Sequence, residues 1–132
     1  MTWGEMSKSS LKAAALLRDQ GLERAAVNRV YYSVYSLAVE RVAKYGPFGG
    51  DLRWSNPPHN EVPLLLDRFT KIPFADRGEM KKIIKELFKK RVEADYKPNA
   101  LIDEIVEKSV FRKALRFQEL ISREPISREP IS

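Results

Sequence analysis

The sequence contains no cysteine and only one histidine, His59, among its 132 residues. Without cysteine the chain can form neither a disulfide framework nor a thiolate metal site. A single histidine likewise argues against a histidine-based metal site within one chain. We therefore expect neither a metal ion nor a cofactor, and the absence of cysteine is typical of a cytoplasmic protein.

Long apolar runs are also missing. No segment approaches the roughly 18 apolar residues that a membrane-spanning helix needs. The residues that follow Met1 lack the basic and apolar regions of a secretory signal. We therefore expect no membrane contact. At 43% hydrophobic and 32% charged residues, the composition is that of a folded domain rather than of a disordered chain.

Positive charge exceeds negative charge, with 24 Lys and Arg residues against 18 Asp and Glu residues and a net charge of +6. A basic surface attracts phosphate-rich partners such as nucleotides and RNA. Many small Lys- and Glu-rich proteins, however, carry such an excess for solubility. Charge alone therefore leaves phosphate binding and a merely soluble surface both open.

Apolar residues recur at helical spacing in five segments, and no segment alternates with the period of a β-strand. The predicted helices run over about residues 2–20, 22–44, 59–69, 76–94 and 99–121. Because most connections between them are short, we predict an all-α, up-and-down antiparallel bundle of four to five helices. The irregular segment 46–58, rich in glycine and proline, is either a flexible loop or a functional one.

Capping residues mark the expected helix starts. Thr2 and Glu5 have the spacing of a capping box, and Asp76 and Glu79 repeat that spacing before the fourth helix. Asn99 is expected to cap the last helix, because its side chain can accept from the first backbone N–H groups.

The end of the chain repeats Ile121-Ser-Arg-Glu-Pro as Ile126-Ser-Arg-Glu-Pro. Closely spaced prolines are incompatible with a continuing helix. We therefore predict a helical domain over residues 1–121 and an extended tail over residues 122–132.

A dense polar and aromatic cluster lies in the second predicted helix. Its members Asn28, Tyr31, Tyr32 and Tyr35 are three or four residues apart, so they share one broad face, with Arg29 beside them. Such a face can line a polar groove for a nucleotide or RNA. It is also typical of a helix whose tyrosines bury their rings and direct their hydroxyls to solvent.

A second cluster, Arg91-Val-Glu-Ala-Asp95-Tyr96, lies at the expected end of the fourth helix. Arg91 and Tyr96 flank Asp95, whose carboxylate can hold the guanidinium bidentately. The pattern predicts either half of a binding site or an ion pair with a packed tyrosine. His59 has no evident partner in the sequence that would make it a catalytic base.

A basic stripe of Lys81, Lys85 and Lys89 follows the same predicted helix. Such a stripe can track a phosphate backbone. With glutamates interspersed, it is more typical of the solvated face of an amphipathic helix.

Three segments together resemble small prokaryotic HEPN-domain proteins. Asn28-Arg-Val-Tyr-Tyr-Ser-Val-Tyr-Ser-Leu-Ala is similar to the second helix of that family, which reads like RAYYAMFHAA. His59-Asn-Glu-Val is similar to its HxxV segment, and Arg91-Val-Glu-Ala-Asp-Tyr to the RxxADY element before its last helix. The resemblance spans roughly residues 3–121 and leaves out the tail.

The resemblance implies a helical bundle that forms a homodimer, with a groove near the dimer interface. It also implies a minimal nucleotidyltransferase as partner in a two-component, toxin–antitoxin pair. Many HEPN proteins are metal-independent ribonucleases with an Arg-x4–6-His motif. Arg91 matches the arginine of that motif, and Tyr96 stands where the histidine is expected.

This departure favours binding over cleavage. A tyrosine, with a pKa of about 10, is a poor general base at neutral pH, although it can donate a hydrogen bond to a phosphate. We therefore expect a nucleotide- or RNA-binding groove. Its predicted lining is Asn28, Arg29, Tyr32, Arg91, Asp95 and Tyr96. Two alternatives remain: a metal-independent ribonuclease toxin that uses Arg91 with Tyr96 or His59, and a purely structural interaction module.

Overall fold

The computed structural model of the chain describes residues 2–45 and 57–124, and within these two ranges all regular structure is helical. The elements are α1 (Trp3–Asp19), α2 (Glu23–Tyr45), the 3-10 turn η3 (His59–Glu61), α3 (Val62–Phe69), α4 (Phe74–Tyr96) and α5 (Glu104–Ile121). The prediction of an all-helical fold is confirmed for these residues. Most of the predicted loop 46–58 lies outside the described residues.

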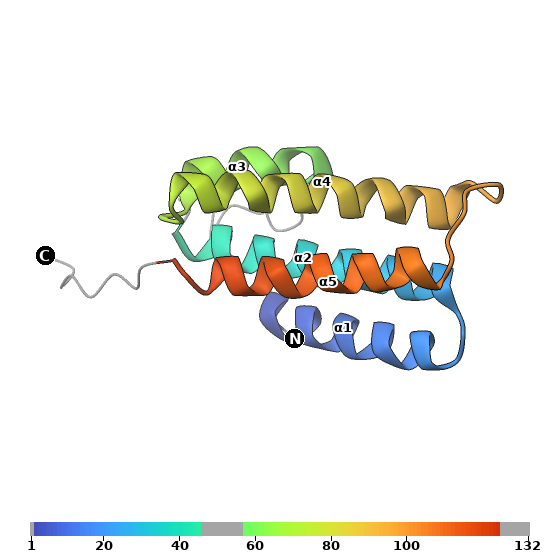
Figure 1. Cartoon of the computed structure of the whole chain (residues 1–132). Coiled ribbons are helices and arrows are strands. Elements are labelled where there is room, and N and C mark those ends of the chain that lie inside the picture. Colours follow the sequence, from blue (N-terminus) through green and yellow to red (C-terminus); the bar gives the residue numbers. More distant parts are fainter. Residues whose placement is uncertain (1, 46–56, 125–132) are drawn as a thin grey trace, which may run out of the picture.

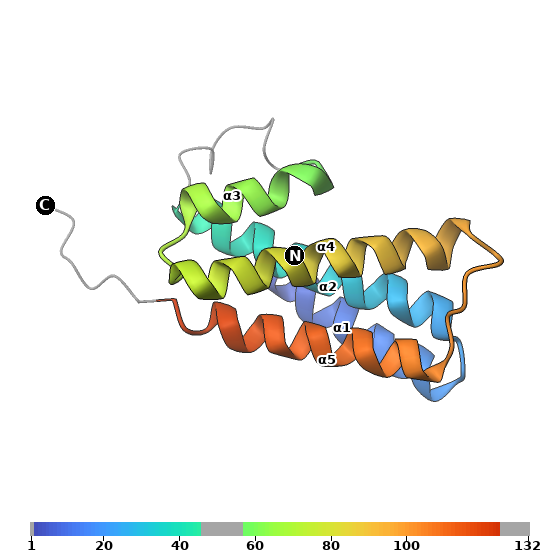
Figure 2. The same ribbon diagram turned by 45° about the horizontal axis from the view of Figure 1, so that its top comes forward.

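The helices are arranged in layers (Figure 1). In that view α3 and α4 form one layer, α2 and α5 the next, and α1 lies on the far side of α2. The sequence neighbours α1 and α2 run antiparallel, as do α4 and α5 (Figures 1 and 2). Because α2 contacts each of the other four α-helices, residues on it meet partners from both halves of the chain.

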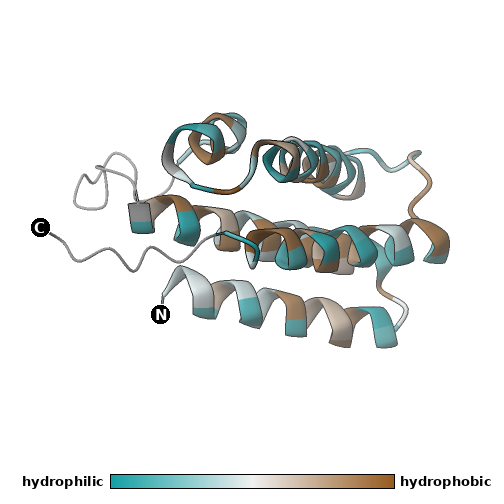
Figure 3. Ribbon diagram, turned by 60° about the vertical axis from the view of Figure 1, so that its left-hand side comes forward, coloured by the Kyte–Doolittle hydropathy of each residue, from teal (hydrophilic) through white to brown (hydrophobic). Residues whose placement is uncertain are grey.

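Burial of apolar side chains from every layer holds the bundle together. Each helix carries both apolar and hydrophilic residues, which Figure 3 shows as brown and teal along the same ribbon. The largest fully buried side chains include Tyr31, Phe117, Leu66, Met80, Leu87 and Leu120. Burying an apolar side chain of this size stabilises the fold by about 1.5–3 kcal/mol.

The start and end of α1 follow from local chemistry. Thr2 is its N-cap, and its hydroxyl accepts from the Glu5 backbone N–H at 3.0 Å, which confirms the predicted cap. Gly21 has a φ of 74° in the left-handed region, where glycine avoids the steric cost of a Cβ. The N–H of Gly21 donates to the Arg18 carbonyl, and the N–H of Leu22 donates to the Leu17 carbonyl. These bonds satisfy the last carbonyls of α1.

The predicted start of α4 at Asp76 is wrong. The helix begins two residues earlier, at Phe74, and its N-cap is Pro73. Proline fixes φ near the helical value, so it starts the chain on a helical course without a capping side chain. Asp76 instead lies in the first turn, where a carboxylate interacts favourably with the helix dipole.

The predicted cap of the last helix, Asn99, is also wrong. α5 begins at Glu104, and its N-cap is Asp103, whose carboxylate accepts from the Val106 N–H at 3.0 Å. Asn99 lies in a turn after Pro98, because proline cannot continue α4. Asp103 therefore caps a helix that begins four residues later than the Asn99 pattern indicated.

The chain remains packed just beyond α5. Glu124 is 5% exposed, and its carboxylate accepts from Arg41 Nη1 at 2.9 Å and from the Lys71 backbone N–H at 2.7 Å. These bonds hold the end of α5 to α2 and to the segment before α4. Residues 125–132 of the predicted tail lie outside the described part of the chain. Among the described helices, none is both long and apolar enough to cross a membrane.

Candidate functional site

The six residues predicted to line a groove come together where α2 packs against the last turns of α4. We call this group the seam cluster, and its members are Asn28, Arg29 and Tyr32 on α2 and Arg91, Asp95 and Tyr96 on α4. Because α4 continues as a helix to Tyr96, Arg91 and Asp95 lie one turn apart on one helix face. Both predicted clusters are therefore parts of one group.

Arg91 is the centre of the seam cluster. Its Nη2 donates to the Tyr32 hydroxyl at 3.2 Å, and its Nε lies 3.1 Å from Asp95 Oδ2 as an ion pair without the geometry of a hydrogen bond. The guanidinium carbon also lies 5.5 Å from the centre of the Tyr32 ring and 5.6 Å from that of Tyr96. Asp95 accepts in addition from Asn28 Nδ2 at 2.8 Å.

A second guanidinium, that of Arg29, also contacts the Tyr32 ring. Arg29 lies 5.1 Å from the centre of that ring, and its Nε donates to Asn28 Oδ1 at 2.8 Å. The seam cluster contains two cations, Arg29 and Arg91, and one carboxylate, Asp95, which forms an ion pair with Arg91, so its formal charge is +1. The net positive charge of the cluster favours binding of an anion.

Donor groups remain in this cluster. Both Nη atoms of Arg29 and the Nη1 of Arg91 make no hydrogen bond to any residue within 2–45 and 57–124. Tyr96 is 69% exposed and contacts Arg91 through its ring. The structure thus places Tyr96 at the solvent side of the cluster, above the guanidinium.

The tyrosines of α2 have different environments. Tyr31 is fully buried and Tyr35 is 3% exposed, whereas Tyr32 is only partly buried and contacts Arg91. The Tyr35 hydroxyl donates to the Pro57 carbonyl. Burial raises the pKa of Tyr35 to about 12. Tyr31 and Tyr35 are therefore part of the core, and Tyr32 alone of the three belongs to the seam cluster.

His59, at the start of η3, has a partner that the sequence did not reveal. Its Nδ1 forms a hydrogen bond with the Tyr31 hydroxyl, and its ring stacks on Phe88 with 5.3 Å between the ring centres. Burial lowers the pKa of His59, and the positive charge of Arg91 lowers it further. His59 is thus a neutral imidazole at pH 7, close enough to Arg91 to feel its charge.

The burial of Tyr31 decides which nitrogen of His59 carries the proton. Burial raises the pKa of Tyr31 far above its usual range, so its hydroxyl stays protonated. In the described part of the chain this hydroxyl has no hydrogen-bond partner other than His59 Nδ1. Because a buried hydroxyl proton needs an acceptor, Tyr31 donates to Nδ1, and the proton of His59 resides on Nε2. His59 can therefore donate a hydrogen bond at Nε2.

Sequence reasoning missed Arg24, which organises the end of α4. Its guanidinium donates to five backbone carbonyls at distances between 2.6 and 3.3 Å. These carbonyls belong to Glu93, Ala94, Lys97, Pro98 and Ala100. The last carbonyls of a helix have no hydrogen-bond donor within the helix. At the end of α4, Arg24 is that donor. Its position four residues before Asn28, on the same face of α2, was the only signal in the sequence.

The three lysines of the basic stripe on α4 differ in their ion pairing. Lys81 forms an ion pair with Asp67 at 2.6 Å. Lys85 and Lys89 are exposed and make no ion pair to any described residue. Two of the three predicted lysines thus add positive charge, without an ion-pair partner among the described residues, to the two turns of α4 that precede Arg91.

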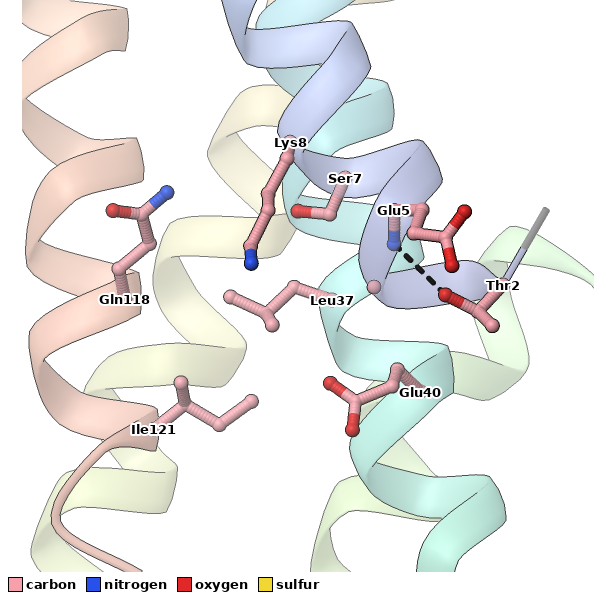
Figure 4. Close-up of a pocket in the computed structure, with 9 residues that line it drawn as sticks. Thr2, Glu5, Ser7, Lys8, Leu37, Glu40, Gln118 and Ile121 are labelled. Atoms are coloured by element: carbon pink, nitrogen blue, oxygen red, sulfur yellow. Dashed lines mark hydrogen bonds between the residues drawn. The ribbon is translucent and has the colours of Figure 1, made fainter.

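A larger cavity of about 810 Å³ lies elsewhere, between α1, α2 and α5 (Figure 4). Lys8 and Gln118 extend toward it from opposite sides, and Leu37 and Ile121 lie below them. None of the predicted site residues lines it. This cavity therefore lies apart from the site that the sequence predicts.

Fold and site together define an all-helical bundle with a cationic polar cluster between α2 and α4. Within the described ranges, no group of three acidic or histidine side chains is placed to hold a metal ion. No protein-family model, no curated protein sequence and no solved structure matches the chain. The resemblance to HEPN proteins stays a prediction.

Proposed function

We propose that this chain is a HEPN-like domain that binds the phosphate of a nucleotide or of RNA at the seam cluster. The observation that carries the proposal is the pair of guanidinium groups, Arg29 and Arg91, held on the Tyr32 ring beside a single carboxylate. A phosphate would balance the remaining positive charge and accept from the Nη atoms that have no hydrogen bond to described residues.

Preorganisation of Arg91 supports the same proposal. Asp95, Tyr32 and the ring of Tyr96 hold its guanidinium in one position before any ligand arrives. A fixed planar guanidinium loses little side-chain entropy when it binds an oxyanion, and its Nη1 makes no hydrogen bond to a described residue. Lysine at this position would supply the charge without the planar guanidinium.

The test is binding of AMP and of a short single-stranded oligoadenylate, measured by isothermal titration calorimetry. We expect Arg91→Ala to weaken both affinities by at least about tenfold, since a hydrogen bond to a charged group contributes about 1.5–3 kcal/mol. Arg112→Ala is the matched control, because Arg112 is an exposed arginine on α5 away from the seam cluster. It removes the same charge and should leave both affinities unchanged.

Two results would overturn the proposal. One is wild-type protein that binds neither AMP nor the oligonucleotide. The other is an Arg91→Ala variant that is folded by circular dichroism and binds as tightly as the wild type. Equal losses in Arg91→Ala and Arg112→Ala would mean that net charge, and not the seam cluster, attracts the ligand.

A second candidate function is metal-independent RNA cleavage with His59 as the base. The observation in its favour is that His59 and Arg91 both contact the rings of Tyr32 and Phe88. Burial, and then the charge of Arg91, lower the pKa of His59. The hydrogen bond from Tyr31 weighs against it, because it places the proton of His59 on Nε2 and occupies Nδ1. RNA cleavage in EDTA that is lost in both His59→Ala and Arg91→Ala would establish this activity in place of simple binding.

The homodimer and the nucleotidyltransferase partner rest on the HEPN resemblance alone. The structure gives little support to an interaction module whose tyrosine face on α2 packs on another molecule. Tyr31 and Tyr35 are buried within the chain itself, so they are not available to a second chain. Co-purification with a cognate nucleotidyltransferase, and the mass of the protein in solution, test these two proposals independently of ligand binding.

A further inference from the structure

A small cavity adjoins the seam cluster on the side of η3. It has a volume of about 200 Å³ and lies between α2, η3, the start of α3 and the middle of α4. Its lining includes Tyr31, His59, Ile84 and Phe88. Ligand pockets for whole drug-sized molecules measure roughly 300–1,000 Å³, so this cavity suits a single flat ring system and not a large ligand.

Three aromatic side chains line the cavity. The rings of Tyr31, His59 and Phe88 contact one another, with 5.3 Å between the centres of Tyr31 and His59 and 5.5 Å between those of Tyr31 and Phe88. The hydrogen bond between Tyr31 and His59 fixes two of these rings. Tyr31 is fully buried, so the partly buried rings of His59 and Phe88 supply the aromatic surface that a planar ligand can contact.

Polar groups stand at the edge of this apolar cavity. The exposed side chains of Asn60 and Lys85 line it. His59 contributes an imidazole whose proton resides on Nε2. A few hydrogen-bonding groups around an apolar ring pocket match the exocyclic and ring heteroatoms of a nucleobase.

The cavity is connected to the seam cluster through Phe88. Arg91 follows Phe88 by one turn of α4, and its guanidinium carbon lies 5.8 Å from the centre of the Phe88 ring. One aromatic ring thus forms part of the cavity wall and part of the surface beneath the proposed phosphate site. Lys85 lies one turn on the other side of Phe88, so cations flank the cavity along α4.

We propose that this cavity is the base subsite of the proposed phosphate site, and that it takes an unpaired nucleobase whose phosphate lies on Arg91. The inference rests on the proposed phosphate binding at the seam cluster. The same chemistry occurs in a free nucleotide and in a residue of single-stranded RNA. A duplex is not a ligand of this subsite, because its bases are stacked and paired.

The experiment compares AMP with ribose 5-phosphate, which carries the same phosphate without a base. Wild-type protein should bind AMP at least about fivefold more tightly, because stacking of one base contributes about 1–3 kcal/mol. Phe88→Leu, which keeps an apolar side chain and removes the ring, should abolish most of that preference, read as the ratio of the two affinities within the same variant.

A second variant guards against a folding defect in Phe88→Leu. Asn60 is exposed at the edge of the cavity, so Asn60→Trp covers the opening without disturbing the core. It should also remove the preference for AMP over ribose 5-phosphate. A preference that survives in both variants would overturn the base subsite.

The outcomes separate the two proposals. Equal affinities of the wild type for AMP and ribose 5-phosphate would overturn the base subsite and leave the phosphate site standing. Absence of binding to either compound would overturn both. A short oligoadenylate that binds more tightly than AMP identifies single-stranded RNA as the source of the base, and the reverse order identifies the free nucleotide.

Discussion

Glu107 on α5 is only 3% exposed, and within the described residues its Oε2 has no hydrogen-bond partner. Burial raises its pKa, and the negative charges of Glu23, Glu104 and Asp19 raise it further, while Arg18 opposes them. A carboxylate in such a place destabilises the fold at neutral pH, because its charge is neither hydrated nor fully paired.

We predict that Glu107→Gln stabilises the protein at pH 7 by about 1 kcal/mol, because the neutral amide removes the buried charge and its repulsion by the nearby carboxylates. A raised pKa means that the folded state binds more protons than the unfolded state. The free energy of unfolding of the wild type therefore rises as the pH falls through the raised pKa of Glu107. The advantage of the glutamine variant should disappear in acid.

Urea denaturation at neutral and acidic pH measures this effect. Glu104→Gln is the control, since the Glu104 side chain is 73% exposed and should contribute little at either pH. A glutamine variant of Glu107 that is less stable than the wild type at pH 7 would show that the buried carboxylate has a stabilising partner.

His59 gives the opposite dependence on pH. Its pKa is lowered in the fold, so the unfolded state binds more protons, and stability falls as the pH drops below the unfolded pKa of about 6.5. His59→Gln cannot titrate, and we predict a smaller loss of stability between neutral pH and about pH 5 than in the wild type. Identical pH profiles for the free energy of unfolding would show that His59 titrates normally.

At the scale of elements, the end of α4 depends on one residue of α2. The guanidinium of Arg24 supplies five carbonyls of α4 and of the turn that follows it, and this end of α4 carries Arg91, Asp95 and Tyr96. Arg24 thus sets how the α4 half of the seam cluster meets the α2 half. It acts on the site through the backbone.

We predict that Arg24→Met lowers the free energy of unfolding by about 2 kcal/mol, since its charge-assisted hydrogen bonds to five partly buried or exposed carbonyls are lost. Hydrogen exchange in the last turn of α4 should accelerate more than exchange in α1. Arg112→Met, on an exposed face of α5, is the matched control and should change neither quantity. Unchanged exchange near residues 93–96 in the Arg24 variant would contradict this account.

The positions of the helices could be predicted from the sequence, and two of their starting points could not. Periodic apolar residues identified each helix, because burial of one face depends mainly on local spacing. The cap assignments failed at Asp76 and Asn99. Both residues have capping side chains, but Pro73, three residues before Asp76, and Pro98, directly before Asn99, set the backbone conformation. Asp103 was a competing cap.

At the scale of the whole molecule, the packing of α2 against α4 assembles a site from residues more than sixty positions apart, such as Asn28 and Asp95. The members of the seam cluster could be predicted because each half is a dense local pattern. The contacts of His59 with Tyr31 and of Arg24 with α4 could not. They depend on how η3 and the α4–α5 turn approach α2, and no local periodicity records that approach.

The central claim is that a phosphate-bearing ligand binds between α2 and α4, and amide chemical shifts of isotope-labelled protein titrated with AMP test it most directly. The account predicts that the largest changes occur at residues 28–32 and 88–96, with smaller ones at residues 59–60. Changes centred on the cavity around Lys8 and Gln118, or none at all at saturating AMP, would contradict it.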